Sequence, residues 1–188
     1  SYISTNATGG SRNMMIAMKN SKFAVTSSTL KASQIYCGKL YRSDKGWYYN
    51  LYQEATNTVF TFHNSLVELA FPAAPGYAAC AGLYFASNAT RNVVLLDGPN
   101  NVFKTVNLMI AGKTNSFEIA DGTLEVTKYF YTGTKYACGG IDNTVKFSGG
   151  TSTINQIVTE CGTNSTIEVC ADAVFNVTGK IWMDSPGG

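Results

Sequence analysis

His63 is the only histidine in the chain, so any catalysis that relies on an imidazole base must use it. A serine or cysteine nucleophile needs an adjacent base to be activated. The sequence contains no GxSxG motif, and His63 stands inside the apolar pattern TVFTFHNSLVELAF. This setting is typical of a histidine on a strand face or edge. We therefore expect no catalytic role for His63, and a single histidine without clustered thiols predicts no transition-metal site.

Carboxylates could support a second kind of chemistry, because glycoside hydrolysis uses two of them at a set separation. Glu118 with Asp121 or Glu125 is a candidate pair within the segment EIADGTLE. Asp121-Gly122 is a preferred type I′ turn, so this segment predicts a hairpin, with Glu118 and Glu125 on opposite sides of its turn. Nothing in the spacing selects these acids for catalysis.

The segment LDGPNN raises the question of calcium, because Asp97, Asn100 and Asn101 offer oxygen ligands. The full spacing of a calcium-binding loop is missing, so a turn is the preferred interpretation. We predict a protein without catalytic residues, metal or cofactor.

Aromatic side chains are the more suggestive feature, and they gather in a hairpin predicted from QIYCGKLY, RSDKG and WYYNLYQ. Strand alternation places Trp47 and Tyr49 on one face, and Tyr48 and Tyr52 on the other. Such a surface suits a protein interface or stacking on sugar rings. The candidate interface or glycan-contact residues are Tyr41, Trp47, Tyr48, Tyr49 and Tyr52.

The overall composition favours β-strands as the elements that carry the aromatic residues. Charged residues make up 14% of the 188 residues, against about a quarter in ordinary soluble domains. Thr, Ser, Asn and Gly take their place, as in strands joined by tight turns. The dispersed net charge of +2 gives no basic stripe for nucleic acid. The apolar stretch 66–86 is interrupted by Pro and Gly, so no membrane span is expected.

Runs with period-2 alternation and turn signals at short intervals predict an all-β fold, specifically an antiparallel β-sandwich or jelly-roll. Only the segment 14–25 suggests a helical turn. The stretches NSFEIADGTLEV and NSTIEVCADAVFNV resemble each other, which makes a β-solenoid-like second half the alternative. We expect a single domain over 1–188 with an N-terminal arm over about 1–13 and a subdivision near 86/87.

Five cysteines show no CxxC motif, and their odd number prevents complete pairing within the chain. Buried, reduced thiols are the expectation, with Cys161 and Cys170 as the best pair in an oxidising compartment. Four Asn-x-Ser/Thr sequons begin at Asn6, Asn88, Asn164 and Asn176.

The composition resembles that of β-rich subunits of virion shells and fibres or of extracellular filaments. This resemblance implies a non-enzymatic structural subunit that binds copies of itself and other structural proteins, located in a virion or at the extracellular surface. The alternative is a β-sandwich module that binds cell-surface glycan. A β-helical polysaccharide-degrading enzyme is the third hypothesis, and it lacks an identifiable set of catalytic acids.

Overall fold

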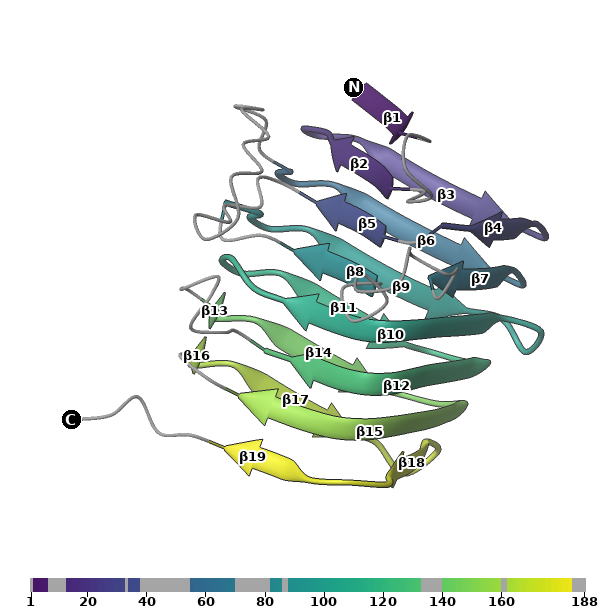
Figure 1. Cartoon of the computed structure of the whole chain (residues 1–188). Coiled ribbons are helices and arrows are strands. Elements are labelled where there is room, and N and C mark those ends of the chain that lie inside the picture. Colours follow the sequence, from purple (N-terminus) through teal and green to yellow (C-terminus); the bar gives the residue numbers. More distant parts are fainter. Residues whose placement is uncertain are drawn as a thin grey trace.

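The protein is all-β in the computed structural model, which describes residues 2–6, 13–32, 34–37, 55–69, 82–85, 88–132, 140–159 and 162–183, and those residues contain no helix. The strands stack as successive rungs, with the N-terminal strands at one end and the C-terminal strands at the other (Figure 1). Within the described residues, no helix is long or apolar enough to cross a membrane.

One side of the stack is a six-stranded parallel sheet, which we call wall 1. Each strand pairs with the strand at the same position in the next rung, so its neighbours lie far away in sequence. In order along the stack, the strands are β3 (Lys22–Thr26), β6 (Val59–His63), β9 (Val93–Asp97), β11 (Ser116–Ile119), β14 (Thr144–Phe147) and β17 (Thr166–Val169).

The opposite side is an eleven-stranded sheet built on three long strands, β10 (Val102–Ile110), β12 (Thr123–Tyr131) and β15 (Thr151–Thr159). A register irregularity interrupts these strands at about their middle and divides the sheet into two halves.

The half before the irregularity, wall 2, also contains β4 (Thr29–Lys31), β7 (Leu66–Leu69) and β18 (Val174–Val177). The half after it, wall 3, contains β2 (Asn13–Ala17), β5 (Gln34–Cys37), β8 (Gly82–Phe85) and β19 (Ile181–Met183). Strand β1 (Tyr2–Asn6) is added to β2, and the short strands β13 (Gly140–Ile141) and β16 (Gly162–Thr163) pair separately.

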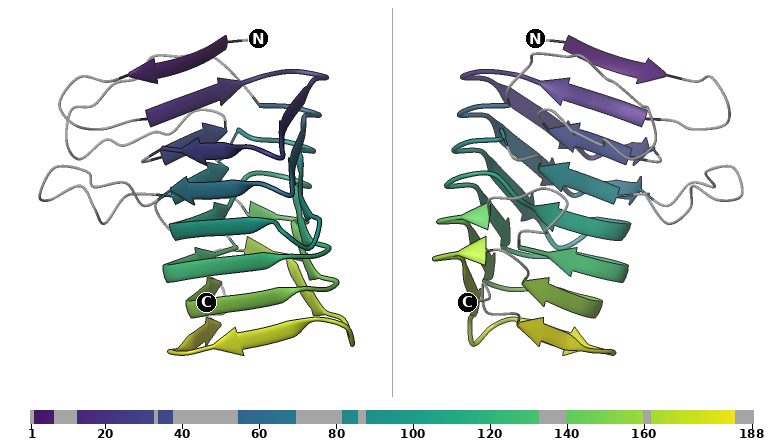
Figure 2. Two further views of the ribbon diagram at one scale, coloured as in Figure 1. Left: turned by 90° about the vertical axis from the view of Figure 1, so that its right-hand side faces the viewer. Right: turned by 60° about the vertical axis from the view of Figure 1, so that its left-hand side comes forward.

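The chain therefore runs along wall 1, wall 2 and wall 3 and then enters the next rung, which is the path of a parallel β-solenoid (Figure 2). The all-β prediction is confirmed, but the antiparallel sandwich or jelly-roll is not: among the described strands only β1 and β2 pair antiparallel. Alternation has the same period in both kinds of sheet, so it does not reveal strand direction. The solenoid alternative was placed in the second half alone, whereas the parallel stacking already begins with β2, β3 and β4.

Two local predictions were also wrong. The segment 14–25 forms parts of β2 and β3 instead of a helical turn. Asp121 and Gly122 do form a turn, but it connects wall 1 to wall 2 rather than two paired strands, because β11 and β12 belong to different sheets.

The predicted arm pairs with its own chain, since Tyr2–Asn6 lies antiparallel to Asn13–Ala17.

The interior is filled by alternate side chains from all three walls, including residues from both sides of position 86/87 in one cluster. Phenylalanine dominates it: the ring centroids of Phe62 and Phe103 lie 5.3 Å apart, and those of Phe60 and Phe85 lie 5.7 Å apart. Both pairs are edge-to-face, the arrangement that aromatic rings prefer. The apolar layers thus continue from rung to rung.

Buried amides line the corner between wall 3 and wall 1. The backbone N–H of Thr58 donates to Oδ1 of Asn92, that of Asn92 to Oδ1 of Asn115, and that of Asn115 to Oδ1 of Asn143. These bonds join residues 34, 23 and 28 positions apart in sequence. We call this column the asparagine ladder. It satisfies backbone groups at a corner where regular strand pairing stops.

Candidate functional site

The aromatic residues predicted to contact a partner, Tyr41, Trp47, Tyr48, Tyr49 and Tyr52, lie outside the described residues. Their proposed role therefore stays a prediction. The described residues offer other candidate features: the histidine, the acids, the charged columns and the ends of the solenoid.

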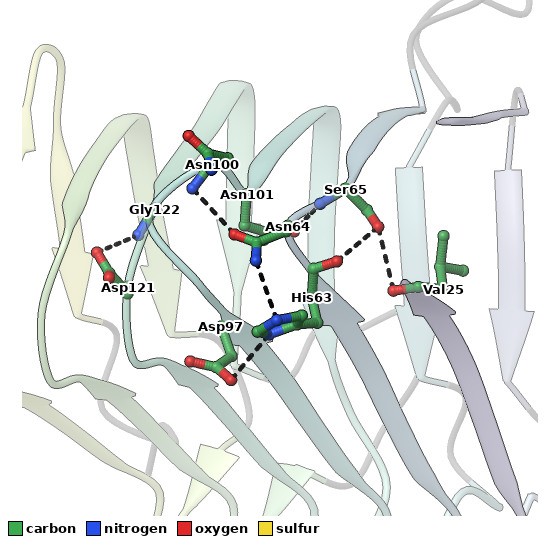
Figure 3. A network of polar contacts seen from close by, with 9 residues as sticks. All are labelled: Val25, His63, Asn64, Ser65, Asp97, Asn100, Asn101, Asp121 and Gly122. Atoms are coloured by element: carbon green, nitrogen blue, oxygen red, sulfur yellow. Dashed lines mark hydrogen bonds and ion pairs between the residues drawn. The ribbon is translucent and has the colours of Figure 1, made fainter. Parts of the chain in front are cut away.

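His63 belongs to a hydrogen-bonded chain at the corner between wall 1 and wall 2 (Figure 3). Its Nδ1 lies 3.1 Å from Oδ2 of Asp97, which occupies the same position in the next rung. Its Nε2 lies 3.0 Å from Nδ2 of Asn64, and Oδ1 of Asn64 accepts the backbone N–H of Asn100 at 3.2 Å. The last bond fixes which end of the Asn64 amide faces the ring.

These partners select one tautomer of the neutral ring. Because the amide nitrogen of Asn64 can only donate, Nε2 of His63 accepts, and the proton of the neutral ring resides on Nδ1. The contact with Asp97 is then a hydrogen bond from Nδ1–H to the carboxylate. In a catalytic triad, a carboxylate also binds Nδ1 of the histidine, and Nε2 faces the nucleophile. Here Asn64 occupies Nε2, the nitrogen that would serve a nucleophile.

The nearby hydroxyl of Ser65 is committed to the same corner. Its single hydroxyl proton is within hydrogen-bond distance of the backbone carbonyls of His63 and Val25, at 2.8 and 3.1 Å, and is shared between them. The backbone N–H of Ser65 donates to Oδ1 of Asn101, which is also buried. These contacts hold three rungs together at the corner, so a structural role accounts for all of them.

The acids considered for glycoside hydrolysis belong to different parts of one rung and have separate partners. Glu118 extends from wall 1 and accepts a hydrogen bond from Ser148 at 2.6 Å. Glu125 belongs to wall 2, and Asp121 accepts the backbone N–H of Gly122 at 2.7 Å. Within the described residues, no three His, Cys, Asp or Glu side chains cluster as a metal site would require.

Wall 2 carries an outward column in which charges alternate from rung to rung. Lys31 lies 2.6 Å from Glu68, and Lys104 lies 3.7 Å from Glu125. Glu68 and Lys104 are register partners, so all four charges form one series. Exposed pairs of this kind contribute less than about 1 kcal/mol each. Their main consequence is that the column presents no net charge to a ligand.

The C-terminal end of the solenoid is the most unusual surface of the described chain. Eight large apolar side chains of the described residues are exposed, and five of them belong to the last rung: Val169, Val174, Ile181, Trp182 and Met183. Of these five, Val174 and Trp182 lie on the outer faces of walls 2 and 3. Ile157 and Ile181 are register partners in wall 3, yet Ile157 is 2% exposed and Ile181 is 55% exposed. Likewise, Phe147 is fully buried and its partner Val169 is 46% exposed.

The backbone is open at the same end. Strands β17, β18 and β19 are the last strands of walls 1, 2 and 3, and the described residues provide no further strand beside them. Strand edges with unpaired N–H and C=O groups are templates for pairing with another chain. Exposed apolar side chains beside such an edge mark an interaction site.

Sequence reasoning missed this end because TIEV and VFNV have the same pattern as buried strands. Burial here depends on whether another rung follows, and the pattern within one rung does not contain that information.

Two cysteines have described environments, and both are free thiols. Cys37 is fully buried in wall 3, and burial strongly raises the pKa of its thiol. Cys170 directly follows β17 and is a free thiol; the pairing with Cys161 that was considered for an oxidising compartment involves a residue outside the described ones. Desolvation raises the pKa of the Cys170 thiol, as does the hydrogen bond that it donates to Glu168 at 3.5 Å.

Comparison of the chain with protein-family models, with curated proteins and with solved structures finds no match.

Proposed function

We propose that this protein is a non-enzymatic structural subunit that self-assembles through the C-terminal end of its solenoid, as part of a virion or extracellular assembly. The observation that carries this proposal is the last rung, where inward positions that are buried in the preceding rung become exposed. An added layer of strands would cover these side chains and pair the open backbone edges.

The remainder of the described surface fits a scaffold. Lysines and glutamates of wall 2 neutralise each other, and His63 is used inside a corner network. The rungs stack along one axis, so the sides of the stack are separated from its two ends (Figure 2). Low overall charge also reduces repulsion between packed copies.

The experiment is to measure molar mass by light scattering over a range of protein concentrations, for the wild-type chain and for Ile181→Lys. Ile181 is more than half exposed, so a lysine is tolerated in the isolated subunit but places a charge in the contact. We expect the wild type to associate with increasing concentration and Ile181→Lys to remain monomeric, with circular dichroism unchanged.

A matched control is Val93→Lys, because Val93 is also exposed but lies on the outer surface of wall 1, away from both ends. It should associate like the wild type. A wild-type chain that stays monomeric at all concentrations, or equal association of both lysine variants, would contradict the proposal.

Glycan binding is the second candidate function, and it is favoured by one observation on wall 3. Register pairing aligns Tyr84, Met109, Tyr131, Val158 and Trp182 in successive rungs, so every second rung carries an aromatic side chain. Adjacent strands are about 4.8 Å apart, so these side chains recur at roughly twice that distance. This repeat is similar to the disaccharide unit of an extended β-linked polysaccharide, and aromatic rings stack well on sugars.

Titration calorimetry with soluble cello- and chito-oligosaccharides tests this candidate in the wild type and in Tyr131→Ala. Tyr131 lies in the middle of the column, and its ring centroid is 5.3 Å from that of Tyr129. Specific binding should weaken at least tenfold in Tyr131→Ala and persist in Ile181→Lys. Absence of heat with both sugar series would reject the glycan hypothesis without affecting the assembly test.

A further inference from the structure

Exposed cations gather on the outside of the corner where each rung passes from wall 3 to wall 1. They belong to the rungs that contain β3, β6, β9 and β11, and we call them the basic edge: Lys19, Lys22, Arg91 and Lys113. These residues are far apart in sequence, so the charge pattern of the chain looks dispersed. The stacking of rungs brings them together on one side of the solenoid.

Backbone contacts fix the spacing of the basic edge. Isolated parallel bridges join Lys19 to Thr56, Thr56 to Thr90, and Thr90 to Lys113. The backbone N–H of Arg91 donates to the carbonyl of Lys113 at 2.9 Å. Since neighbouring strands are about 4.8 Å apart, the basic edge extends over roughly 14 Å along the stack.

The charges of the basic edge are not neutralised by the described chain. Lys22, Arg91 and Lys113 take part in none of the described ion pairs, which lie on walls 1 and 2. The basic edge ends at the following rung, where Asp142 accepts a hydrogen bond from Asn164 at 3.3 Å. The corner segments of the four rungs contain no Asp or Glu: residues 18–22, 55–59, 88–93 and 111–116.

The backbone of Arg91 is in a conformation that suits asparagine better than arginine. Its φ is +56°, in the left-handed region where Asn and Asp are the favoured residues after glycine. Other rungs have Asn or Asp at this corner position, apart from Thr114: Asn20, Asn57, Asp142 and Asn164. The local fold therefore does not favour arginine here, and such an outlier supports a functional role for the side chain.

We propose that the basic edge binds an extended acidic polysaccharide with about one carboxylate per sugar, which lies along the corner. The edge carries on average one cation per rung, or one per about 4.8 Å. An extended β-linked chain advances by a similar length with each sugar. The neutral side chains among the cations can form hydrogen bonds with sugar hydroxyls: Asn20, Thr56, Asn57, Thr90 and Thr114. This site lies on the side of the solenoid and is separate from the proposed assembly surface.

Nucleic acid fits the basic edge less well. Duplex DNA carries one negative charge per about 1.7 Å of its axis, a density roughly three times that of the cations along the edge. Proteins bind single strands by stacking bases on aromatic side chains in a positively charged groove. The corner segments of these four rungs contain no Phe, Trp or Tyr. Charge density and composition therefore both favour the polysaccharide.

Isothermal titration calorimetry with soluble oligomers of β-linked mannuronate tests the proposal at low ionic strength. The double variant Arg91→Asn with Lys113→Gln removes two exposed cations from the basic edge. Because two charge-assisted contacts are lost, the affinity should fall about tenfold or more. Thermal unfolding should show no loss of stability, since asparagine suits the backbone at position 91. Added salt should weaken binding to the wild type.

The matched control is the double variant Lys31→Gln with Lys104→Gln, which lowers the net charge equally. Its two lysines are exposed on wall 2 but pair with Glu68 and Glu125, so it should bind like the wild type. Absence of binding to the wild type, equal affinity of both double variants, or affinity unchanged by salt would overturn the proposal. Tighter binding of poly(dT) than of the mannuronate oligomers would also overturn it. None of these outcomes affects the light-scattering test of self-assembly.

Discussion

Asn92 and Asn115 occupy the same position in consecutive rungs, and the backbone N–H and Nδ2 of Asn92 both donate to Oδ1 of Asn115, at 2.9 and 3.0 Å. Nδ2 of Asn115 in turn donates to the carbonyls of Ala89 and Ala111, at 3.0 and 2.8 Å. A single amide thereby satisfies groups from several segments in a buried corner. Neither a hydroxyl nor a carboxylate can accept two hydrogen bonds and donate two hydrogen bonds in this way.

The first prediction concerns this amide. Asn115→Ala should lower the free energy of unfolding by about 3 kcal/mol or more, because several buried donors and acceptors lose their partner together. Asn115→Asp should also destabilise, since a carboxylate cannot donate to the two carbonyls. Urea unfolding followed by circular dichroism measures both.

Asn155 provides the control, because it is less buried and its Nδ2 makes one contact of 3.3 Å with the carbonyl of Thr127. Asn155→Ala should change stability by less than about 1 kcal/mol. Equal losses at the two positions would show that the ladder has no special importance.

A second prediction concerns the turn at Gly122. Its φ is +88°, and a Cβ added there would lie 2.4 Å from the backbone oxygen of Asn101. Gly122→Ala should therefore cost more than about 2 kcal/mol through backbone strain and this contact. The exposed neighbouring substitution Thr123→Ala should be almost neutral in the same thermal unfolding experiment. A Gly122→Ala chain with wild-type stability would exclude this turn geometry.

The sequence predicted strand positions better than strand partners. Alternation in VFTFH and VVLLD correctly indicates strands, and the inward side chains Phe60 and Phe62 are buried. Pairing direction was missed because each strand meets a partner in another rung, and the rungs differ in length. Hydrogen bonds between equivalent corner residues span 37, 34, 23, 28 and 22 positions, so no fixed period is visible.

The faint internal repeat was genuine but aligned one residue out of register. Similarity of NSFEIADG and NSTIEVCA matched Asn115 with Asn164, whereas strand pairing matches Asn115 with Asn143 and Asn143 with Ser165. The candidate site was missed for a related physical reason. Ile157 and Ile181 have similar local surroundings, and their different burial depends on the presence of a following rung.

The corrected register yields a third prediction, at Ser165. This residue follows Asn143 in the ladder, but its Oγ is buried without a hydrogen-bond partner among the described groups. Ser165→Asn should extend the ladder, because the longer side chain can accept the backbone N–H of Asn143. We expect a gain of about 1 kcal/mol in unfolding free energy. Ser165→Ala tests the alternative that filling this position with any small side chain is sufficient, and it should not produce that gain.

The last prediction concerns the reactivity of Cys170. Alkylation proceeds through the thiolate, so its rate follows ionisation of the thiol. The pKa of Cys170 is raised by desolvation, then by its hydrogen bond to Glu168 and the charge of that carboxylate, while Lys146 acts in the opposite direction. In dilute protein, Cys170 should therefore require a higher pH for half-maximal alkylation than a cysteine in the unfolded chain. Glu168→Gln should shift the midpoint to lower pH and Lys146→Gln to higher pH, as measured by mass spectrometry of the Cys170 peptide.

Cys37 serves as an internal control, since its buried thiol should react only after unfolding. Shifts in the same direction for both variants would show that the Lys146–Glu168 pair, separated by 3.8 Å, does not govern the thiol through its charges.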